Sequence, residues 1–182
     1  MIALLIFLAL LLVTAVAVIS IYNKLVMLKN RMHEAWSGID VFLKKRHDLV
    51  PNLVATVKGY ATHEQQTLED ITRFRAQAMQ AHDQGARIAS ETGLGQALGR
   101  LMVVSENYPD LKASINFLEL QKQLSGIEEE LSLSRRYYNG TVRENNIRIE
   151  SFPSNLIAGM FRFVKGKFFE IDKTETAVPN FT

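Results

Sequence analysis

The chain has 182 residues, of which 47% are hydrophobic, and its formal net charge is +2. This length suits one domain with its own core plus one extra element, and so small a charge gives no reason to expect a nucleic-acid partner. The sequence contains no cysteine, which excludes a disulfide framework and a lipid anchor attached through cysteine.

The first 22 residues predict a single transmembrane helix. No charged side chain occurs before Lys24. About 20 helical residues are enough to cross a bilayer core of roughly 30 Å. Tyr22 lies where an interfacial aromatic residue is expected. The residues that define the predicted membrane span are Ile2, Leu5, Leu8, Leu12, Val16, Ile19 and Tyr22.

A cleaved signal peptide is the alternative for this segment, because Ala15, Val16 and Ala17 form a small-x-small site. Signal peptides begin with a positively charged region, which is absent here, and the apolar run continues beyond that site. The basic residues that follow the span, from Lys24 to Arg31, favour an outer N-terminus and a cytoplasmic domain. The sequence therefore predicts a single-pass membrane protein with a retained N-terminal anchor.

Residues 23–160 predict an all-α antiparallel bundle, because apolar residues recur at steps of three and four. The pattern indicates a long helix that continues from the membrane to about Ala81. A loop with three glycines, 82–95, would separate it from a shorter helix over 95–107. A third long helix would run from Pro109 to about Glu150, and Ser154 would cap a short one to Ala158. The expected core stripe of the third helix is Phe117, Leu120, Leu124, Ile127, Leu131, Ser134 and Tyr138.

Pro51 interrupts the apolar pattern of the long helix. Proline removes one backbone hydrogen bond and clashes with the preceding turn, at a cost of about 3 kcal/mol. The helix could kink there, or it could break and start again with Asp48 as a cap. We interpret Pro51 as a helix bend.

Four histidines are each followed by an acid, at His33, His47, His63 and His82. They are separated by 14, 16 and 19 residues, whereas two ligands on one helix need a spacing of three or four. We therefore predict polar groups on exposed helix faces, together with Lys44, Lys45 and Arg46 and with Glu128, Glu129 and Glu130. No catalytic residue, metal site or cofactor site is predicted.

The segment "GLGQALG", from Gly93, has glycines near those of a phosphate-binding loop. The spacing is wrong and no strand precedes it, so we interpret these glycines as small residues at a helix start that allow close packing.

The tail, 161–182, mixes aromatic and basic residues. It could pack back onto the bundle as an extended segment or small hairpin, or it could contact a partner or the membrane. We expect Trp36 and the "RRYYN" segment to pack inside the bundle, and the alternative is that they face a partner. The candidate interaction surface is Trp36, Arg135, Arg136, Tyr137, Phe161, Phe163, Phe168 and Phe169.

Three long stretches of the chain resemble the LemA family. They are "YNKLVMLKNRMHEAWSGIDVFLKKRHDLVPNLVATVKGYATHE", "LGRLMVVSENYPDLKASINFLELQKQLSGIEEELSLSRRYYNGTVRENN" and "FPSNLIAGMFRFVKGKFFE". One departure lies at Arg162, where the family usually has a glycine before the phenylalanine. The resemblance implies a helical bundle on a single-pass anchor, and no catalytic or cofactor residues.

Function follows mainly from this resemblance, since family members are associated with envelope stress, with magnetosome membranes and with partners such as an HtpX-type metalloprotease. From the resemblance we expect a non-enzymatic scaffold or adaptor of the bacterial inner membrane, linked to envelope maintenance or stress, that forms homo-oligomers and has no small-molecule substrate. The alternative is a membrane-remodelling or lipid-organising protein, which the basic residues and the aromatic tail suggest. An enzyme is the least favoured class, and bound metal would be its indication.

Overall fold

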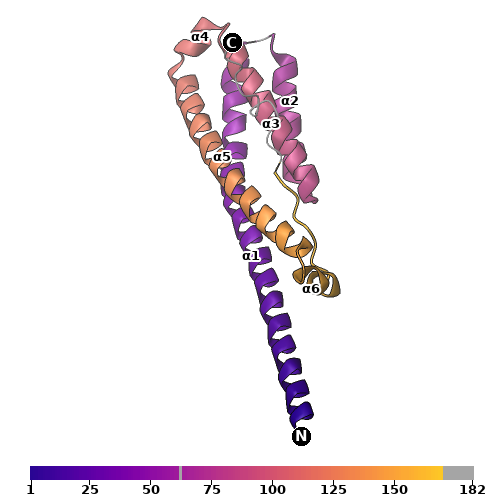
Figure 1. Ribbon diagram of the computed structural model, residues 1–182. Helices are drawn as coiled ribbons and strands as arrows, with labels where there is room; N and C mark the ends of the chain where they lie inside the picture. The colour runs from indigo at the N-terminus through magenta and orange to yellow at the C-terminus, as the bar shows by residue number, and fades with distance from the viewer. Residues whose placement is uncertain (62, 170–182) are drawn as a thin grey trace, which may run out of the picture. The chain divides into compact units, whose positions relative to one another are not determined.

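The computed structural model describes residues 1–61 and 63–169, and within these residues all regular structure is helical (Figure 1). This confirms the all-α prediction. The helices are α1 (Ile2–Lys58), α2 (Gln65–Gln80), α3 (Gln84–Ser105), α4 (Pro109–Ala113), α5 (Ile115–Glu150) and α6 (Ser154–Met160).

The chain forms two compact units. Unit 1 comprises Met1–Gly38 and Ser134–Phe168, and unit 2 comprises Ile39–Leu133 and Phe169. The boundary between the units falls within α1 and within α5, so each of these helices contributes one segment to unit 1 and another to unit 2. The predicted boundaries at 22/23 and 160/161 stay predictions, and residues 170–182 of the predicted tail lie outside the described part.

In unit 1, the first half of α1 carries its apolar side chains on the surface. Ile2, Leu5 and Leu12 are 64 to 76% exposed, and no residue of the 18-residue window with the highest hydropathy is buried. A core helix of a water-soluble protein would be mostly buried, so this helix is built for an apolar surrounding. Further along α1, Leu25, Leu28 and Ala35 are buried, as the stripe predicts.

Unit 2 is a helical bundle around one apolar core. The stripe of α1 continues into it, α2 and α3 pack as an antiparallel pair joined by a short connection, and α5 adds Phe117, Leu124 and Leu131. The buried cluster consists of Leu49, Val50, Leu53, Val57, Ala61, Leu68, Ile71, Leu94, Ala97, Leu98, Leu101, Leu111, Phe117 and Leu124. Of the core stripe predicted for the third helix, Phe117, Leu124, Leu131 and Tyr138 are buried, and the other three residues are partly buried.

Three predicted boundaries were wrong. The long helix ends at Lys58 instead of Ala81, and the chain turns before α2 begins at Gln65. Most of the predicted loop 82–95 is helical, because the Asp83 carboxylate accepts a hydrogen bond from Ala86 N at 3.0 Å and caps α3. The helix predicted from Pro109 is divided at Ser114, whose ψ of 120° is extended.

The helix α1 continues through Pro51, so the alternative of a break capped by Asp48 was wrong. The bend itself stays a prediction. Ser154 begins α6, but its hydroxyl donates to the carbonyl oxygens of Arg148 and Ser151, at 2.6 and 2.9 Å, instead of capping the new helix.

Candidate functional site

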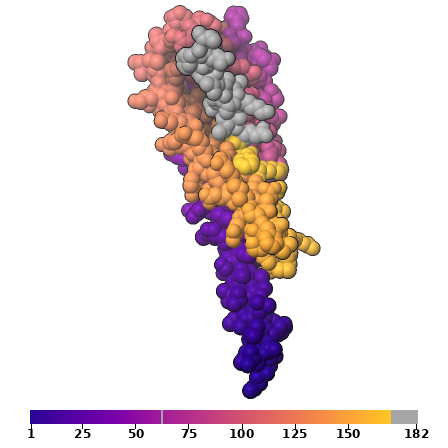
Figure 2. All heavy atoms as spheres, in the orientation of Figure 1, coloured from indigo at the N-terminus to yellow at the C-terminus, as the bar shows by residue number. Residues whose placement is uncertain are grey.

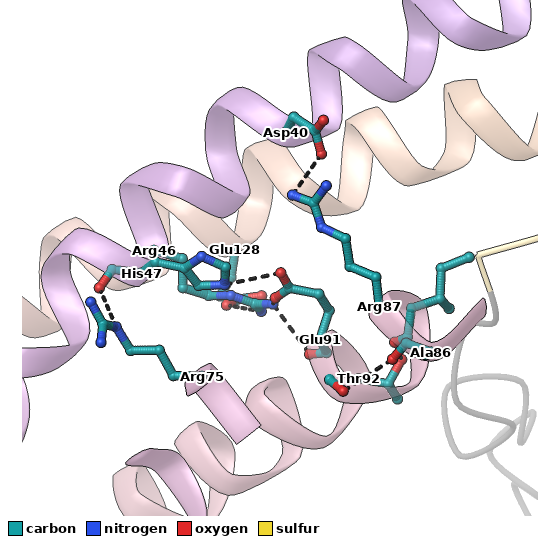
Figure 3. A network of polar contacts seen from close by, with 11 residues as sticks. Asp40, Arg46, His47, Arg75, Ala86, Arg87, Glu91, Thr92 and Glu128 are labelled. Carbon is teal, nitrogen blue, oxygen red and sulfur yellow. Dashed lines mark hydrogen bonds and ion pairs between the residues drawn. The ribbon is translucent and has the colours of Figure 1, made fainter. Parts of the chain in front are cut away.

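A fully buried arginine lies at the centre of unit 2. Arg46 of α1 is 0% exposed, and its guanidinium reaches carboxylates from two other helices (Figure 3). Its Nη2 lies 2.5 Å from Oε2 of Glu91 on α3, and its Nη1 lies 2.8 Å from Oε1 of Glu128 on α5. Nη2 also donates to the Glu91 carbonyl oxygen at 3.2 Å. One side chain thus connects three helices.

His47 contributes a second cation-capable group to the same acid. Its Nε2 lies 2.9 Å from Oε1 of Glu91, so the two oxygens of this buried carboxylate face two different residues of α1. Burial acts to raise the pKa of Glu91. The contact with His47 and the charge of Arg46 outweigh that effect and leave the pKa below its ordinary value, which favours the ionised acid.

The carbonyl oxygen of His47 has an unusual partner. In a regular helix it would accept from the backbone N–H of residue 51, but Pro51 has none. Arg75 of α2 donates from Nε to this oxygen at 2.8 Å. The hydrogen bond that proline removes is therefore replaced by one from a neighbouring helix, which explains how α1 continues through Pro51.

A further ion pair lies towards the surface of the same unit. Arg87 Nη2 of α3 is 2.9 Å from Oδ1 of Asp40 on α1, and both side chains are about one-third exposed. Burial raises the pKa of Asp40, and the charge of Arg87 offsets only part of this rise. We call Arg46, His47, Glu91, Glu128 and Arg75 the buried charge cluster.

This cluster corrects several predictions. Arg46, His47 and Glu128 were expected on solvated helix faces, but the first two are buried and the third is largely covered. The sequence did hold a signal: Ile39, Leu43, Arg46, Val50, Leu53 and Val57 follow steps of three and four, so Arg46 occupies a core position. Glu91 occupies the equivalent position between Ile88 and Leu94 on α3.

The histidines do not converge. His33, His63 and His82 are exposed and only His47 is buried. Within residues 1–61 and 63–169, no three His, Cys, Asp or Glu side chains are grouped so that they could hold a metal ion. In the buried charge cluster, Arg46 and Glu91 are paired and fully buried, and the contacts of Arg46 join α1 to α3 and α5.

Aromatic contacts mark the second notable region, in unit 1. The Tyr22 ring lies 4.7 Å from that of Phe161 and 5.9 Å from that of Phe163, measured between centroids. The Trp36 ring meets Tyr138 edge-on at 5.3 Å. The Tyr22 contacts join the end of the apolar segment of α1 to the chain that follows α6, and the Trp36 contact joins α1 to α5.

The residues of the candidate interaction surface are divided by the structure. Arg136, Tyr137, Phe161 and Phe168 are exposed, whereas Trp36, Arg135 and Phe163 are half-buried. Phe169 is buried and packs within the protein.

The chain after α6 packs back in extended form as far as it is described. Gly166 N donates to the Asn146 side chain at 2.8 Å, Asn146 Nδ2 donates to Gly166 O at 3.1 Å, and Tyr138 donates to Lys167 O at 2.8 Å.

The comparison with protein families shows the family of this chain, because the model of the LemA family matches residues 35–182. The chain belongs to the LemA family. Its first 34 residues, which carry the apolar segment, precede the matched region. It is a membrane-associated helical protein of that family.

Two kinds of relative are similar to this LemA family member. Protein LemA of Metamycoplasma hominis is 27% identical over 154 residues, which cover 84% of this chain and 70% of that protein. Magnetosome protein MamQ 1 of Paramagnetospirillum magneticum is 24% identical over 175 residues, covering 82% and 64%. Magnetosome protein MamQ of Magnetospirillum gryphiswaldense is 22% identical over 174 residues, covering 81% and 64%. The chain thus covers less than two-thirds of the length of these MamQ proteins.

Proposed function

We propose that this LemA family protein is a non-enzymatic scaffold or adaptor of the bacterial inner membrane, which forms homo-oligomers and serves envelope maintenance. The observation that carries the proposal is the continuity of α1. One helix leads from a wholly unburied apolar segment into the core of unit 2, where Arg46 ties it to α3 and α5. A folded unit is thereby attached to an anchor without a flexible linker.

The charges beside the anchor support a cytoplasmic position of unit 2, with the N-terminus outside. Lys24, Lys29 and Arg31 are exposed on α1 just after the apolar segment, while no charged side chain precedes it. A positive flank favours the cytoplasmic side of a membrane.

Exposed apolar side chains in unit 2 support a role in assembly. Val103 and Ile115 are 73 and 82% exposed, and Leu118 and Leu133 are about half exposed. Ile115 and Leu118 are neighbours on one face of α5, and grouped apolar side chains on a surface mark protein contacts. The magnetosome name of the MamQ relatives fits a protein that organises a membrane compartment. A membrane protease of the HtpX type is the partner that the family resemblance suggests.

The test is the mass and composition of the full-length protein, purified from native membranes in mild detergent. Light scattering should give a mass of several copies, or a peak with a stoichiometric membrane protein such as a protease. A matched pair of variants, Leu133→Ser and Ser132→Ala on α5, should show loss of assembly in the first and none in the second. A monomer that elutes without any partner would contradict the proposal.

A lipid-organising protein is the second candidate function, supported by exposed basic side chains such as Lys44 and Lys45 of α1. Such contacts weaken as salt screens them. Vesicle clustering or tubulation by the reconstituted protein, lost in added salt, would favour this candidate over the scaffold. Zinc or iron at unit stoichiometry in the purified protein would favour an enzyme over both.

A further inference from the structure

The short helix α6 has two contrasting sides. One side, with Ser154, Ile157 and Ala158, is buried. Ile157 and Ala158 form a cluster with Leu25 of α1, against which Val18 and Ile21 also pack. In Figure 2 the atoms of α6 and of the segment after it, in orange and yellow, lie against α1 near the end of its indigo apolar part.

These contacts fix the level of α6 along α1. Val18 and Ile21 belong to the run without charged side chains, and Leu25 comes just after its end. Helical residues rise about 1.5 Å each, so the contacted stretch is about 10 Å long and straddles the end of that run. The polar zone on one side of a bilayer is about 5–8 Å thick. A bilayer spanned by α1 therefore has its interface at the level of α6.

The other side of α6 is apolar and exposed. Leu156 and Met160, one helical turn apart, are 63 and 64% exposed, and Phe152 before the helix is 80% exposed. Phe161 and Val164 extend this surface after the helix. We call Phe152, Leu156, Met160, Phe161 and Val164 the α6 surface.

The turn after α6 keeps this surface beside Tyr22. Phe163 N donates to Ala158 O at 2.9 Å and Arg162 N to Gly159 O at 3.2 Å, which is the hydrogen-bond pattern of a Schellman motif. The turn brings Phe161 and Phe163 onto the Tyr22 ring, and it leaves the Arg162 side chain exposed. An apolar surface bordered by tyrosine and arginine is the composition of helices that lie in a membrane interface.

We propose that α6 is a second membrane contact, which lies in the interface of the bilayer that α1 spans. Its α6 surface enters the boundary between headgroups and acyl chains. The occupant is phospholipid because the surface adjoins the apolar segment of α1: Phe161, which belongs to the α6 surface, contacts the ring of Tyr22 at the end of that segment. The inference rests on the proposed anchoring by α1. Two contact points, unlike one, fix the rotation of α1 about its own axis.

The absence of cysteine permits a direct test with single labels. Full-length protein is prepared with Phe152→Cys, Leu156→Cys or Met160→Cys, labelled with an environment-sensitive fluorophore, and reconstituted in vesicles of phosphatidylethanolamine and phosphatidylglycerol. Thr14→Cys, in the apolar segment, is the control for lipid, and Gln123→Cys, exposed on α5, is the control for water. Helix content by circular dichroism verifies that each labelled chain is folded, and the label at Phe152 lies outside α6.

Lipids with a nitroxide near the headgroup should quench the labels at the α6 surface several-fold more than the label at Gln123. Aqueous iodide should quench them several-fold less. If these labels respond to iodide as Gln123→Cys does while Thr14→Cys is quenched by lipid, the inference is wrong and the anchoring stands. Labels shielded from iodide yet insensitive to lipid nitroxides would show that protein covers the α6 surface, which also overturns it. If Thr14→Cys itself behaves as aqueous, the proposed anchoring falls as well.

Discussion

A guanidinium that is fully withdrawn from water, as that of Arg46 is, must find its hydrogen-bond acceptors inside the protein. Glu91 supplies two of them, through its side chain and its carbonyl oxygen, and Glu128 supplies a third. Replacement of one partner leaves a buried charge without compensation, whereas replacement of both can be nearly neutral. This asymmetry distinguishes a buried ion pair from an exposed one.

We expect Arg46→Met to lower the free energy of unfolding by about 3 kcal/mol or more. The double variant Arg46→Met with Glu91→Leu should lose at least about 1 kcal/mol less than the sum of the single losses. The measurement is urea unfolding in mild detergent, followed by circular dichroism. Arg31→Met, which breaks the exposed pair with Glu144, is the matched control and should cost less than about 1 kcal/mol. Equal losses for the two arginines would contradict the burial of Arg46.

The lowered pKa of Glu91 makes stability depend on pH. The unfolded chain binds the Glu91 proton more readily than the folded chain does, so the contribution of this acid is complete above about pH 4.5, its ordinary value, and is lost as the pH falls through the folded pKa. Glu91→Gln removes this contribution. Its free energy of unfolding should therefore fall less steeply than that of the parent below that pH. An equally steep fall would assign the acid sensitivity to other groups.

Arg162 ends α6 in a conformation that favours glycine. Its φ is 56°, in the left-handed region, where a side chain costs about 1–2 kcal/mol. Glycine, which has no Cβ, avoids this cost. Arg162→Gly should raise the free energy of unfolding by about 1 kcal/mol, measured as for Arg46. Arg136→Gly, at an exposed position inside α5, should lower it by a similar amount. A loss of stability in Arg162→Gly would show that its side chain contributes more than its strain.

At the scale of the elements, the apolar period was enough to predict the presence of long helices and most of their core residues. Their ends were predicted less well. Three glycines predict a loop over 82–95, but the Asp83 cap and the close packing of Gly93 against Phe74 of α2 outweigh glycine's poor helix propensity. The interpretation of small residues that permit close packing is supported at Gly93, although it lies within the helix and not at its start.

Gly93 and Gly99 of α3 provide a matched pair. A Cβ at Gly93 would lie 2.6 Å from the Phe74 ring of α2, whereas at Gly99 it would meet nothing within 4 Å. Gly93→Ala should therefore destabilise unit 2 by about 1–3 kcal/mol. Gly99→Ala should stabilise it by about 0.5–1 kcal/mol, because alanine is the better helix former. Thermal unfolding of both variants gives the comparison. Two shifts of the same sign would contradict the packing of α2 on α3.

The hydrogen bond from Arg75 to the His47 carbonyl oxygen, which replaces the one that Pro51 cannot donate, gives a prediction about coupling between α1 and α2. Arg75→Met should cost about 1–3 kcal/mol, since it leaves the His47 carbonyl oxygen without its donor. In a Pro51→Ala background the N–H of residue 51 returns to that oxygen, so the same substitution should cost about 1 kcal/mol less. Urea unfolding of the four proteins in this cycle measures the difference. Additive losses would show that Arg75 acts elsewhere.

At the scale of the whole molecule, the sequence predicted an anchor followed by helices but gave no sign of two units. Both units are built from the same helical period, and α1 and α5 cross their boundary without an interruption in pattern. The partners of Arg46 were equally hidden, because Glu91 and Glu128 lie 45 and 82 residues away in sequence and only the packed helices bring them together. Arg46 itself could have been recognised from its place in the apolar stripe.

In the sequence, the main segment of unit 2 lies between the two segments of unit 1, and this order has a consequence for synthesis. The ribosome makes Met1–Gly38 first, then all of Ile39–Leu133, and only afterwards the Ser134–Phe168 segment that covers Leu25 and Trp36. At roughly 5–20 residues per second, the intervening stretch takes about 5–20 s to translate. For that interval the apolar segment is already available to the membrane, while Leu25 and Trp36 further along α1 are not yet covered. A nascent chain of this kind offers chaperones a binding site that the finished protein no longer has.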